Sequence, residues 1–447
     1  MERIIVSSEN IKPDLPTPRH LKTHKLSLLD QIMASILVPV VFYFPSPLPQ
    51  SSNHDLDLFI SHTTQQLKKS LSVVLTRFYP FAGRVNLDDN GHSIDCADQG
   101  VHFTVAKFPG HNLSDLLENP DRTDLPSLLL PGVEFIYGEV DPESRVLMIQ
   151  VNYFDCGGIA MGVVFWHKLA DAATMANFLI SWGNANRGSK HVASPNYIFQ
   201  NLFPHRPELV NLPQPTLQLS TKWALKRYVF DASTISVLQR LESSGSVKNV
   251  TKVEAVLTIL WKCFMAASLE NGKSESSLML TVDLRRKAQP PFASDCFGNF
   301  ISFPVAESRN HDRADLPRKL RDAISKIDEN FVTSLQGDGD FIGRLQNFFG
   351  SRLLAPDESD ILFISSLCGF GTYGIDFGWG NPVWIAPCCD TSSDLKSKSL
   401  RMANSVWLMD TRIGHGVEAI VTLKEEYMPA FDHAMNVLQG LAASSRM

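Results

Sequence analysis

The sequence predicts an α/β protein with two domains, each combining a mixed sheet with flanking helices. The chain has 447 residues, which exceeds what one hydrophobic core normally supports, so we expect two domains of roughly 200 residues each. Apolar residues recur at strand spacing and at helical spacing in both halves. Residues 186–220 are polar and rich in proline, as is typical of a domain boundary. We therefore expect an N-terminal domain over residues 1–200, a linker over residues 201–220 and a C-terminal domain over residues 221–447.

Charge and hydropathy argue against two classes of partner. The net charge is −6, and no basic stripe is present to bind the phosphates of a nucleic acid. The longest apolar run near the N-terminus, residues 32–44, is interrupted by Pro39 and is shorter than the ~20 residues that a membrane-spanning helix requires. We expect neither nucleic acid nor membrane as a partner, although a local basic patch could still bind an anionic cofactor.

The cysteines indicate a reducing compartment. There are seven, they are scattered along the chain, and none has Cys-x-x-Cys spacing, so neither disulfides nor a zinc site are expected. A cytoplasmic location follows as the expectation. The final tripeptide, Ser445-Arg446-Met447, has the small, basic, apolar pattern of the peroxisomal signal Ser-Lys-Leu without matching it, which keeps the peroxisome as an alternative.

The N-terminal half begins with extended structure, including a strand-like run at residues 38–44. A helix is predicted over residues 65–78, where one face is apolar: Leu67, Leu71, Val74, Leu75 and Phe78. It ends at residues 79–84, and strands are expected at residues 93–96 and 101–105. This part of the chain therefore indicates a helix packed on a sheet.

A β-hairpin leads into the most distinctive stretch of the chain. Residues 146–154 have a strong strand pattern, residues 155–158 read Asp-Cys-Gly-Gly and predict a turn, and residues 159–166 predict the second strand. Helical spacing follows, with Asp171 where an N-cap is favoured. His167 is therefore expected at a strand-to-helix junction.

An imidazole at such a junction can be held rigidly and still reach a substrate, and it can act as a general base near neutral pH. The His-x-x-x-Asp spacing alone is a weak signal, because it also occurs at His111 and at His311. His111 lies in a polar turn and His311 in a charged run, whereas His167 follows a buried strand. The alternative for His167 is a core histidine that is hydrogen-bonded to a backbone carbonyl.

The C-terminal half also mixes strands and helices. Thr251 and Glu254 have the spacing of a capping box and predict a helix that runs to about residue 267. Residues 308–350 are charged and helical in pattern, with a break at residues 337–340. The other expected elements are strands at residues 222–230, 277–284, 361–367, 382–386, 405–409 and 417–423, and helices at residues 233–241 and 429–441.

A second unusual stretch, residues 373–382, reads Tyr-Gly-Ile-Asp-Phe-Gly-Trp-Gly-Asn-Pro. Its interleaved glycines and aromatic residues predict a tight bend. We favour a structural loop, fixed by a side-chain pairing of Asp376 and by buried rings, over direct catalysis. Direct catalysis is less favoured because no residue of the loop other than Asp376 is a good proton acceptor.

The stretches His167-Lys168-Leu169-Ala170-Asp171 and Asp376-Phe377-Gly378-Trp379-Gly380 together resemble the HxxxD and DFGWG motifs of the plant BAHD acyltransferases, in the same order and about 200 residues apart. Ala172 departs from the family, in which many members have Gly after the motif aspartate. Together with Asp155-Cys156-Gly157-Gly158 and the N-terminal third, this departure resembles the branch that acetylates alkaloids. Further matching pieces extend nearly end to end, at residues 26–30, 78–84, 155–158, 282–285 and 297–299.

The resemblance implies two similarly folded α/β domains like those of chloramphenicol acetyltransferase, with a channel between them. Acyl-CoA would enter the channel from one face and the acceptor alcohol from the other, with His167 midway. Asp171 would turn away from the substrate and pair with Arg285. The loop formed by Asp376, Phe377, Gly378, Trp379 and Gly380 would shape the CoA side without touching the reacting atoms. The resemblance implies no metal and a monomer.

The expected function is therefore the transfer of an acetyl or short acyl group from acyl-CoA, as co-substrate, to a hydroxyl of an alkaloid, with His167 as general base. No permanently bound cofactor is expected. A terpenoid, sugar or other alcohol, or a longer or branched acyl donor, is an alternative. A thioester hydrolase with Cys156 as nucleophile is an alternative of another class, although a small buried residue is the simpler interpretation of Cys156. An inactive member that binds a metabolite is a third.

Overall fold

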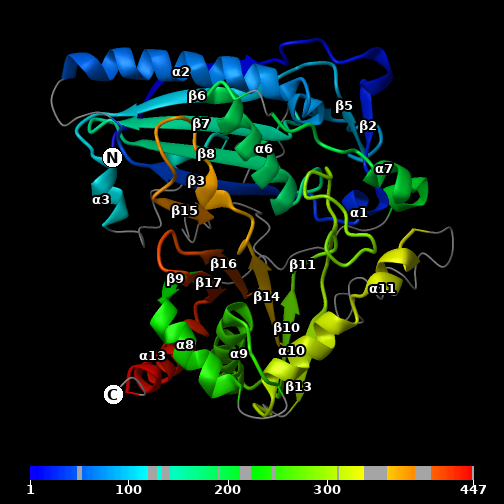
Figure 1. Ribbon diagram of the computed structural model, residues 1–447, viewed down its shortest axis with the longest axis vertical. Helices are drawn as coiled ribbons and strands as arrows, with labels where there is room; N and C mark the ends of the chain where they lie inside the picture. Colours follow the sequence, from blue (N-terminus) through cyan, green and yellow to red (C-terminus); the bar gives the residue numbers. More distant parts are fainter. Residues whose placement is uncertain are drawn as a thin grey trace. The chain divides into compact units, whose positions relative to one another are not determined.

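The computed structural model describes residues 1–47, 53–118, 128–132, 141, 143–189, 192–211, 223–243, 247–309, 312–336, 360–387 and 404–444. The chain divides into two compact units (Figure 1). Unit 1 comprises Met1–Thr216, Ala293–Asn299 and Phe370–Leu400, and unit 2 comprises Leu217–Phe292, Phe300–Gly369 and Arg401–Met447. Each unit contains a six-stranded mixed sheet with helices, which confirms the predicted two-part α/β architecture.

The sheet of unit 1 consists, in spatial order, of β1 (Ile4–Ile11), β6 (Val101–Phe108), β7 (Leu147–Phe154), β8 (Ile159–Trp166), β3 (Leu37–Phe44) and β15 (Trp384–Pro387). Strands β6 and β7 are parallel, and the other neighbours are antiparallel. Every residue of β7 and β8 is buried, as expected for central strands that are covered on both faces. The predicted hairpin thus forms the middle of the sheet.

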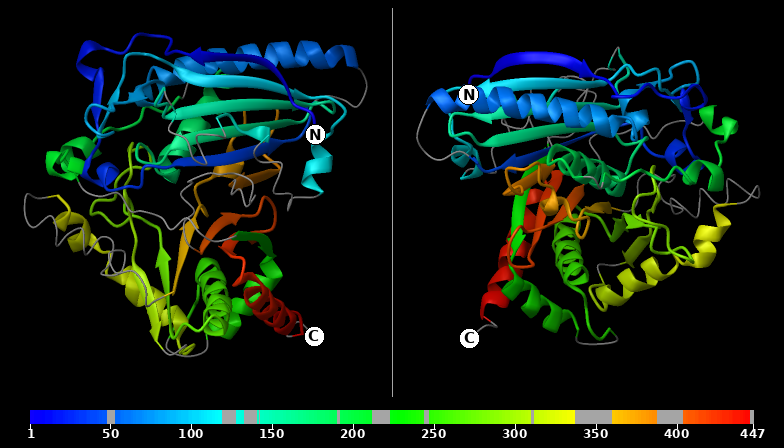
Figure 2. Two further views of the ribbon diagram at one scale, coloured as in Figure 1. Left: turned by 180° about the vertical axis from the view of Figure 1, so that it is seen from behind. Right: turned by 45° about the horizontal axis from the view of Figure 1, so that its top comes forward.

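Two long helices accompany this sheet. Helix α2 (Asn53–Leu75) packs against α6 (Ala172–Asn186), and both run beside the strands (Figures 1 and 2). The predicted apolar face of α2 is buried, although the helix begins well before residue 65. The short elements of the unit are α1 (Leu28–Gln31), α3 (Leu113–Leu117), α7 (Phe199–Leu202) and a small sheet of β2 (Thr23–Lys25), β5 (Ser93–Asp95) and β4 (Arg84–Val85).

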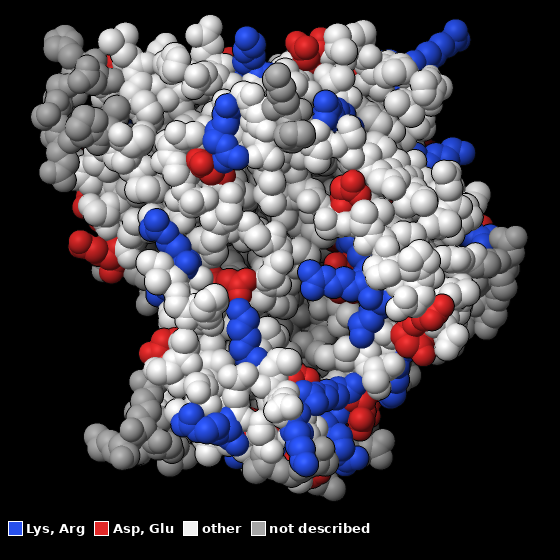
Figure 3. All heavy atoms as spheres, viewed as in Figure 1, with Lys and Arg blue, Asp and Glu red and all other residues white. Residues whose placement is uncertain are grey.

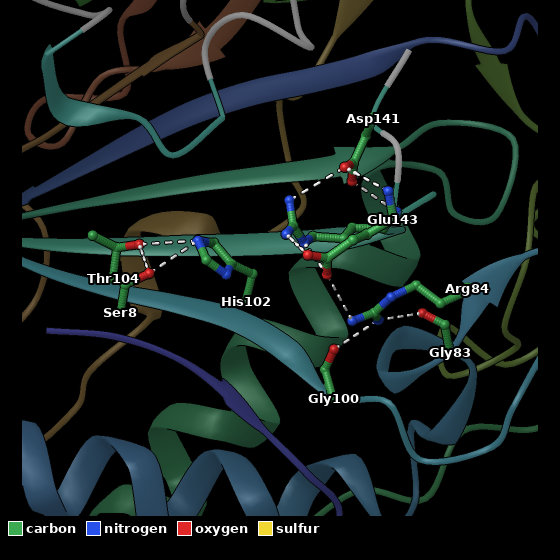
Figure 4. Close-up of polar contacts among 9 residues, drawn as sticks. Ser8, Gly83, Arg84, Gly100, His102, Thr104, Asp141 and Glu143 are labelled. Atoms are coloured by element: carbon green, nitrogen blue, oxygen red, sulfur yellow. Dashed lines mark hydrogen bonds and ion pairs between the residues drawn. The ribbon is translucent and has the colours of Figure 1, made fainter.

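A polar network joins β4, the residue before β6 and the turn before β7 (Figure 4). Arg84 Nη1 donates to the carbonyl oxygens of Gly83 and Gly100, at 2.8 Å each. Glu143 pairs with Arg145 at 2.6 Å and with Arg84 at 3.8 Å. These contacts stay within unit 1 and tie the small sheet to the large one, so we assign the network a structural role.

The sheet of unit 2 consists, in spatial order, of β13 (Val305–Arg309), β10 (Glu275–Leu280), β14 (Asp360–Ser366), β16 (Ser405–Asp410), β17 (Val417–Lys424) and β9 (Trp223–Phe230). Strand β14 is parallel to both of its neighbours, and the other pairs are antiparallel. A separate pair is formed by β11 (Val282–Asp283) and β12 (Ile301–Ser302).

The longest described helix of unit 2 is α9 (Lys252–Glu270), which begins at the predicted capping box of Thr251 and Glu254. Trp261 and Phe264 of this helix are fully buried in the core. The remaining helices are α8 (Ala232–Glu242), α10 (Leu316–Ser325), α11 (Glu329–Ser334) and α13 (Met428–Ser444), and α8, α10 and α13 contact α9.

Three sequence predictions differ from the structure. Edge strand β1 was not predicted, because most of its residues are exposed and its pattern is not that of a buried strand. Residues 305–309 form β13, paired with β10, so the helix expected from residue 308 begins only at Leu316. The Asp376–Gly380 loop, expected in the C-terminal domain, lies in unit 1, because the strand that follows it, β15, pairs with β3.

Other expectations fall outside the described residues, namely those for His311, the break at residues 337–340, Cys388, Cys389 and Ser445-Arg446-Met447. Among the described residues, no helix has the length and apolar character to cross a membrane. On the face drawn in Figure 3, basic and acidic side chains lie interspersed among uncharged ones.

Candidate active site

The main chain of the His167 junction is fixed on both sides. His167 N donates to Ile36 O at 2.8 Å, which ties the end of β8 to the segment before β3. At the other end, Asp171 is extended, with φ −88° and ψ 179°, and its side chain accepts from Thr174 N at 2.9 Å. This is the N-cap that the sequence predicts. The five-residue turn that carries the imidazole is therefore held by the sheet and by the helix.

The His167 side chain is half-buried between two buried neighbours, Trp166 and Lys168. Its Nδ1 atom is buried and has no hydrogen-bond partner among the described residues. Burial lowers the pKa of His167 below its ordinary value, against the smaller opposing effects of its own main chain, of Asp171 and of Asn299. The imidazole is therefore neutral near pH 7 and has an unprotonated nitrogen that can accept a proton.

Asn299, from the segment Ala293–Asn299 of unit 1, reaches the same junction. Its Nδ2 lies 2.9 Å from His167 O and 3.3 Å from Lys168 O. It also contacts Asp30 of α1, and both residues are buried. In the sequence, Asp30 and Asn299 stand out only as members of two of the stretches that resemble the family. A role at the junction could not be assigned to them, because 132 residues separate Asn299 from His167.

Arg285, the partner expected for Asp171, belongs to unit 2. Its side chain is buried, and its Nη1 lies 3.0 Å from Asp283 Oδ1. Its main chain is fixed by Phe292 N, which donates to Arg285 O at 2.9 Å. Asp171 is buried in unit 1. The pairing of Asp171 with Arg285 stays a prediction.

The Asp376–Gly380 loop is held by its aspartate. Asp376 Oδ1 accepts from Gly378 N at 2.7 Å and from Gly380 N at 3.0 Å, and Oδ2 pairs with Arg187 at 3.0 Å. Partial burial raises the pKa of Asp376, but these two hydrogen bonds and the Arg187 charge outweigh it and leave the pKa below its usual value. Gly378 and Gly380 have φ values of +104° and +103°, which a side chain would strain. Asp376 thus makes the side-chain pairing that the sequence leads us to expect, and the supporting role of the loop stays a prediction.

The rings of the loop pack against α6. Phe377 is buried, and its ring centroid lies 4.8 Å from that of Trp182 in an edge-to-face arrangement. Asn186 Nδ2 donates to Phe377 O at 2.6 Å. Gly183 permits the close approach, since a Cβ there would lie 2.6 Å from Asp376 O. Sequence reasoning did not single out Gly183, although an isolated glycine inside a helical pattern is a known sign of close packing.

Helix α6 contacts the His167–Asp171 motif at its first turn and the Asp376–Gly380 loop at its last turn. Asp171 caps its first turn, whereas Arg187, directly after its last residue, contacts Asp376. At 1.5 Å per residue, these two ends lie about 24 Å apart along the axis. The structure therefore does not bring the loop to His167, and the loop supports the helix from its far end.

Cys156 lies in the hairpin turn and is exposed, which corrects the expectation of a buried residue. Its Sγ accepts from Leu113 N at 3.3 Å. Strand β8 separates it from His167, and eight residues of extended chain span about 26 Å. A thiolate and an imidazole so far apart cannot form the nucleophile–base pair that a hydrolase of this kind needs.

Comparison with known proteins identifies the family. The profile of the Transferase family matches residues 4–438. Stemmadenine O-acetyltransferase from Catharanthus roseus is 33% identical over 95% of this chain and 94% of its own, and limonoid 7-O-acetyltransferase from Citrus sinensis is 36% identical over 96% and 95%. The crystal structure of vinorine synthase superposes with a TM-score of 0.78 at 29% identity, covering 96% of each chain. The chain therefore belongs to the Transferase family, the BAHD acyltransferases, and is an acyl-CoA-dependent O-acyltransferase.

Proposed function

We propose that this enzyme transfers an acetyl group from acetyl-CoA to a hydroxyl of a plant specialised metabolite, with His167 as the general base. An alkaloid is the first acceptor class, because the similar proteins include stemmadenine O-acetyltransferase and vinorine synthase. A limonoid is the second, supported by the 36% identity to limonoid 7-O-acetyltransferase. O-acetylation of a hydroxyl is the same chemistry for either class.

The observation that carries this proposal is the neutral, half-buried imidazole of His167 on a fixed turn. As the acceptor oxygen attacks the thioester carbonyl, the unprotonated ring nitrogen takes the hydroxyl proton. The tetrahedral intermediate then expels the CoA sulfur, and the imidazolium returns the proton to that sulfur. The C–O bond forms, the C–S bond breaks, and the proton passes from oxygen to sulfur without an acyl-enzyme.

The other motif residues have supporting roles in this proposal. Asp171 caps α6 beside the base, and its pairing with Arg285 would neutralise a buried carboxylate. Asp376, Phe377, Gly378, Trp379 and Gly380 form the loop that holds the far end of α6. In this proposal, none of these groups exchanges a proton with the substrate.

Product analysis tests the acceptor class. Purified protein is incubated with acetyl-CoA and, separately, with panels of hydroxylated alkaloids and hydroxylated limonoids, and the products are analysed by mass spectrometry. An acetylated product from either panel supports the proposal and selects the class. If only a longer or branched acyl-CoA gives product, the acetyl donor is wrong. If no panel gives an ester with any acyl-CoA, the proposed acceptor classes are wrong.

A further inference from the structure

The pairing of β3 with β8 extends one residue pair beyond the two strands. In the last pair of the strands, Leu37 lies opposite Trp166. The next pair is joined by His167 N, which donates to Ile36 O at 2.8 Å, and the ladder ends there because Ile36 N donates to Ala34 O at 3.0 Å. Ile36 therefore lies opposite His167. Side chains directly opposite in an antiparallel pair stand on the same face, with their Cβ atoms about 4.5–5.5 Å apart.

A second set of contacts defines the face from which Ile36 projects. Leu37 packs against the hydrophobic cluster that includes Val164, so these two residues belong to one face of the sheet. Trp166, two residues after Val164, projects from the same face, and its Nε1 donates to Ser35 Oγ at 3.1 Å. Successive side chains of an extended chain alternate between the two faces, so Ile36, between Ser35 and Leu37, projects from the other one.

The face that Ile36 shares with His167 is apolar. Phe165 lies two residues before His167 on β8, and the centroids of the two rings are 6.4 Å apart. Phe165 is 6% exposed, and Val38, which lies opposite it on β3, is 4% exposed. Ile36 and His167, one step further along, are both half-buried. Burial therefore decreases towards the ends of the strands, and an apolar side chain stands beside the imidazole where the face becomes accessible.

We propose that Ile36 is a specificity-determining residue, whose side chain forms an apolar wall beside the base and meets the carbon atoms next to the acceptor hydroxyl. A second hydroxyl on an adjacent carbon would lose water against this wall and gain no hydrogen-bond partner from it, which is costly. The acceptor is therefore an alcohol on a hydrocarbon skeleton and not a vicinal diol. This inference rests on the proposed role of His167 as base, and it argues against the sugar alternative.

Carbethoxylation of the imidazole tests the placement of Ile36 without any acceptor. Diethyl pyrocarbonate reacts with neutral imidazole, and the tryptic peptide of residues 146–168 contains His167 as its sole histidine, so mass spectrometry reports the rate at this residue. At pH 7, Ile36→Ala should raise the rate above wild type and Ile36→Trp should lower it, because the first opens one side of the ring and the second covers it. A rate that neither variant changes overturns the proposal.

Leu37→Ala is the matched control, because Leu37 is the next residue of the chain and packs on the opposite face. This variant should leave the rate of carbethoxylation at His167 at its wild-type value. The Tm of each variant shows whether the fold is retained. A rate that rises equally in Leu37→Ala and in Ile36→Ala would report a general loosening of β3 and would contradict the proposal.

Protection of His167 by two small alcohols tests the acceptor class. Cyclohexanol and the vicinal cis-diol of cyclohexane differ by one hydroxyl next to the reacting one. Cyclohexanol should half-protect His167 from carbethoxylation at a concentration roughly 10- to 100-fold lower than the diol, and Ile36→Ser should reduce this ratio. Equal protection by the two alcohols, including none by either, overturns the proposal. Full turnover by His167→Ala would instead contradict the proposed function, and the carbethoxylation rates would still report where Ile36 lies.

Discussion

The Asp171 carboxylate accepts a hydrogen bond from Thr174 N at 2.9 Å, so the aspartate of the His-x-x-x-Asp motif is the N-cap of α6. The spacing of the motif follows from this relationship. The histidine belongs to the end of a strand and the aspartate to the start of a helix, and the residues between them form the turn. The aspartate therefore fixes the start of the helix that follows the histidine turn.

Substitution of Asp171 should reduce stability and turnover together. Asp171→Ala loses the cap and should lower the free energy of unfolding by about 0.5–2 kcal/mol more than Asp171→Asn, since asparagine also caps well. Denaturant unfolding and steady-state kinetics of both variants measure the two effects. If Asp171→Asn keeps the wild-type unfolding free energy and loses activity, the aspartate has a chemical role.

Gly183→Ala should loosen the Asp376–Gly380 loop. The added Cβ would lie 2.6 Å from Asp376 O, which is main chain and cannot rotate aside, so we expect a destabilisation of about 1–3 kcal/mol. Gly440→Ala is the control, because it also adds a methyl group to a helix and meets nothing within 4 Å. Thermal unfolding should therefore show a lower Tm for Gly183→Ala alone. Equal Tm values for the two variants would mean that the close approach is unimportant.

Asp30 should make stability depend on pH. Burial raises its pKa to about 6, against the hydrogen bonds from Asn299 and Ser27 and above the unfolded value of 3.8. The folded state therefore binds the proton more tightly, and this contribution is complete below pH 3.8 and lost as the pH rises through about 6. A shift of this size corresponds to about 3 kcal/mol. Burial lowers the pKa of Lys168 to about 8, and the charges of Asp30 and Asp89 oppose this shift.

The measurement is urea unfolding of wild type and Asp30→Asn between pH 4.5 and pH 7.5. The unfolding free energy of wild type relative to the variant should fall as the pH rises across this range. A difference that is constant with pH would show that Asp30 does not titrate there.

Cys156 should be dispensable for acyl transfer. It is exposed at the far end of β8, about 26 Å along the strand from His167, so Cys156→Ala should keep the wild-type kcat. Mass spectrometry after incubation with acetyl-CoA should find no acyl group on this residue. An acyl adduct on Cys156 that forms and decays at the turnover rate would restore the hydrolase interpretation.

Local signals predicted the junction well. The hairpin, the turn of Asp155 to Gly158 and the N-cap at Asp171 depend on residues close in sequence. The spacing of apolar and turn residues was therefore enough to predict them. The capping box of α9 followed from Thr251 and Glu254 alone. In each case the stabilising contact joins residues a few positions apart, which is the range over which a pattern can be recognised.

Contacts between distant segments could not be predicted in the same way. Strand β15 joins β3 across more than 300 residues, and this pairing places the preceding loop in unit 1. The hydrogen bonds of Asn299 to His167 and Asp30 likewise depend on how three segments meet. The residues that make these contacts are far apart in the sequence and form no recognisable spacing pattern.

The most direct test of the account measures CoA thiol release from acetyl-CoA by wild type and by His167→Ala, with and without an acceptor that gives product. The account predicts release by wild type only when the acceptor is present. His167→Ala should be slower by a factor on the order of 10² to 10⁴, with an unchanged Tm. Release by His167→Ala at the wild-type rate, or release that needs no acceptor, would contradict the role of His167 as the base of an acyl transfer.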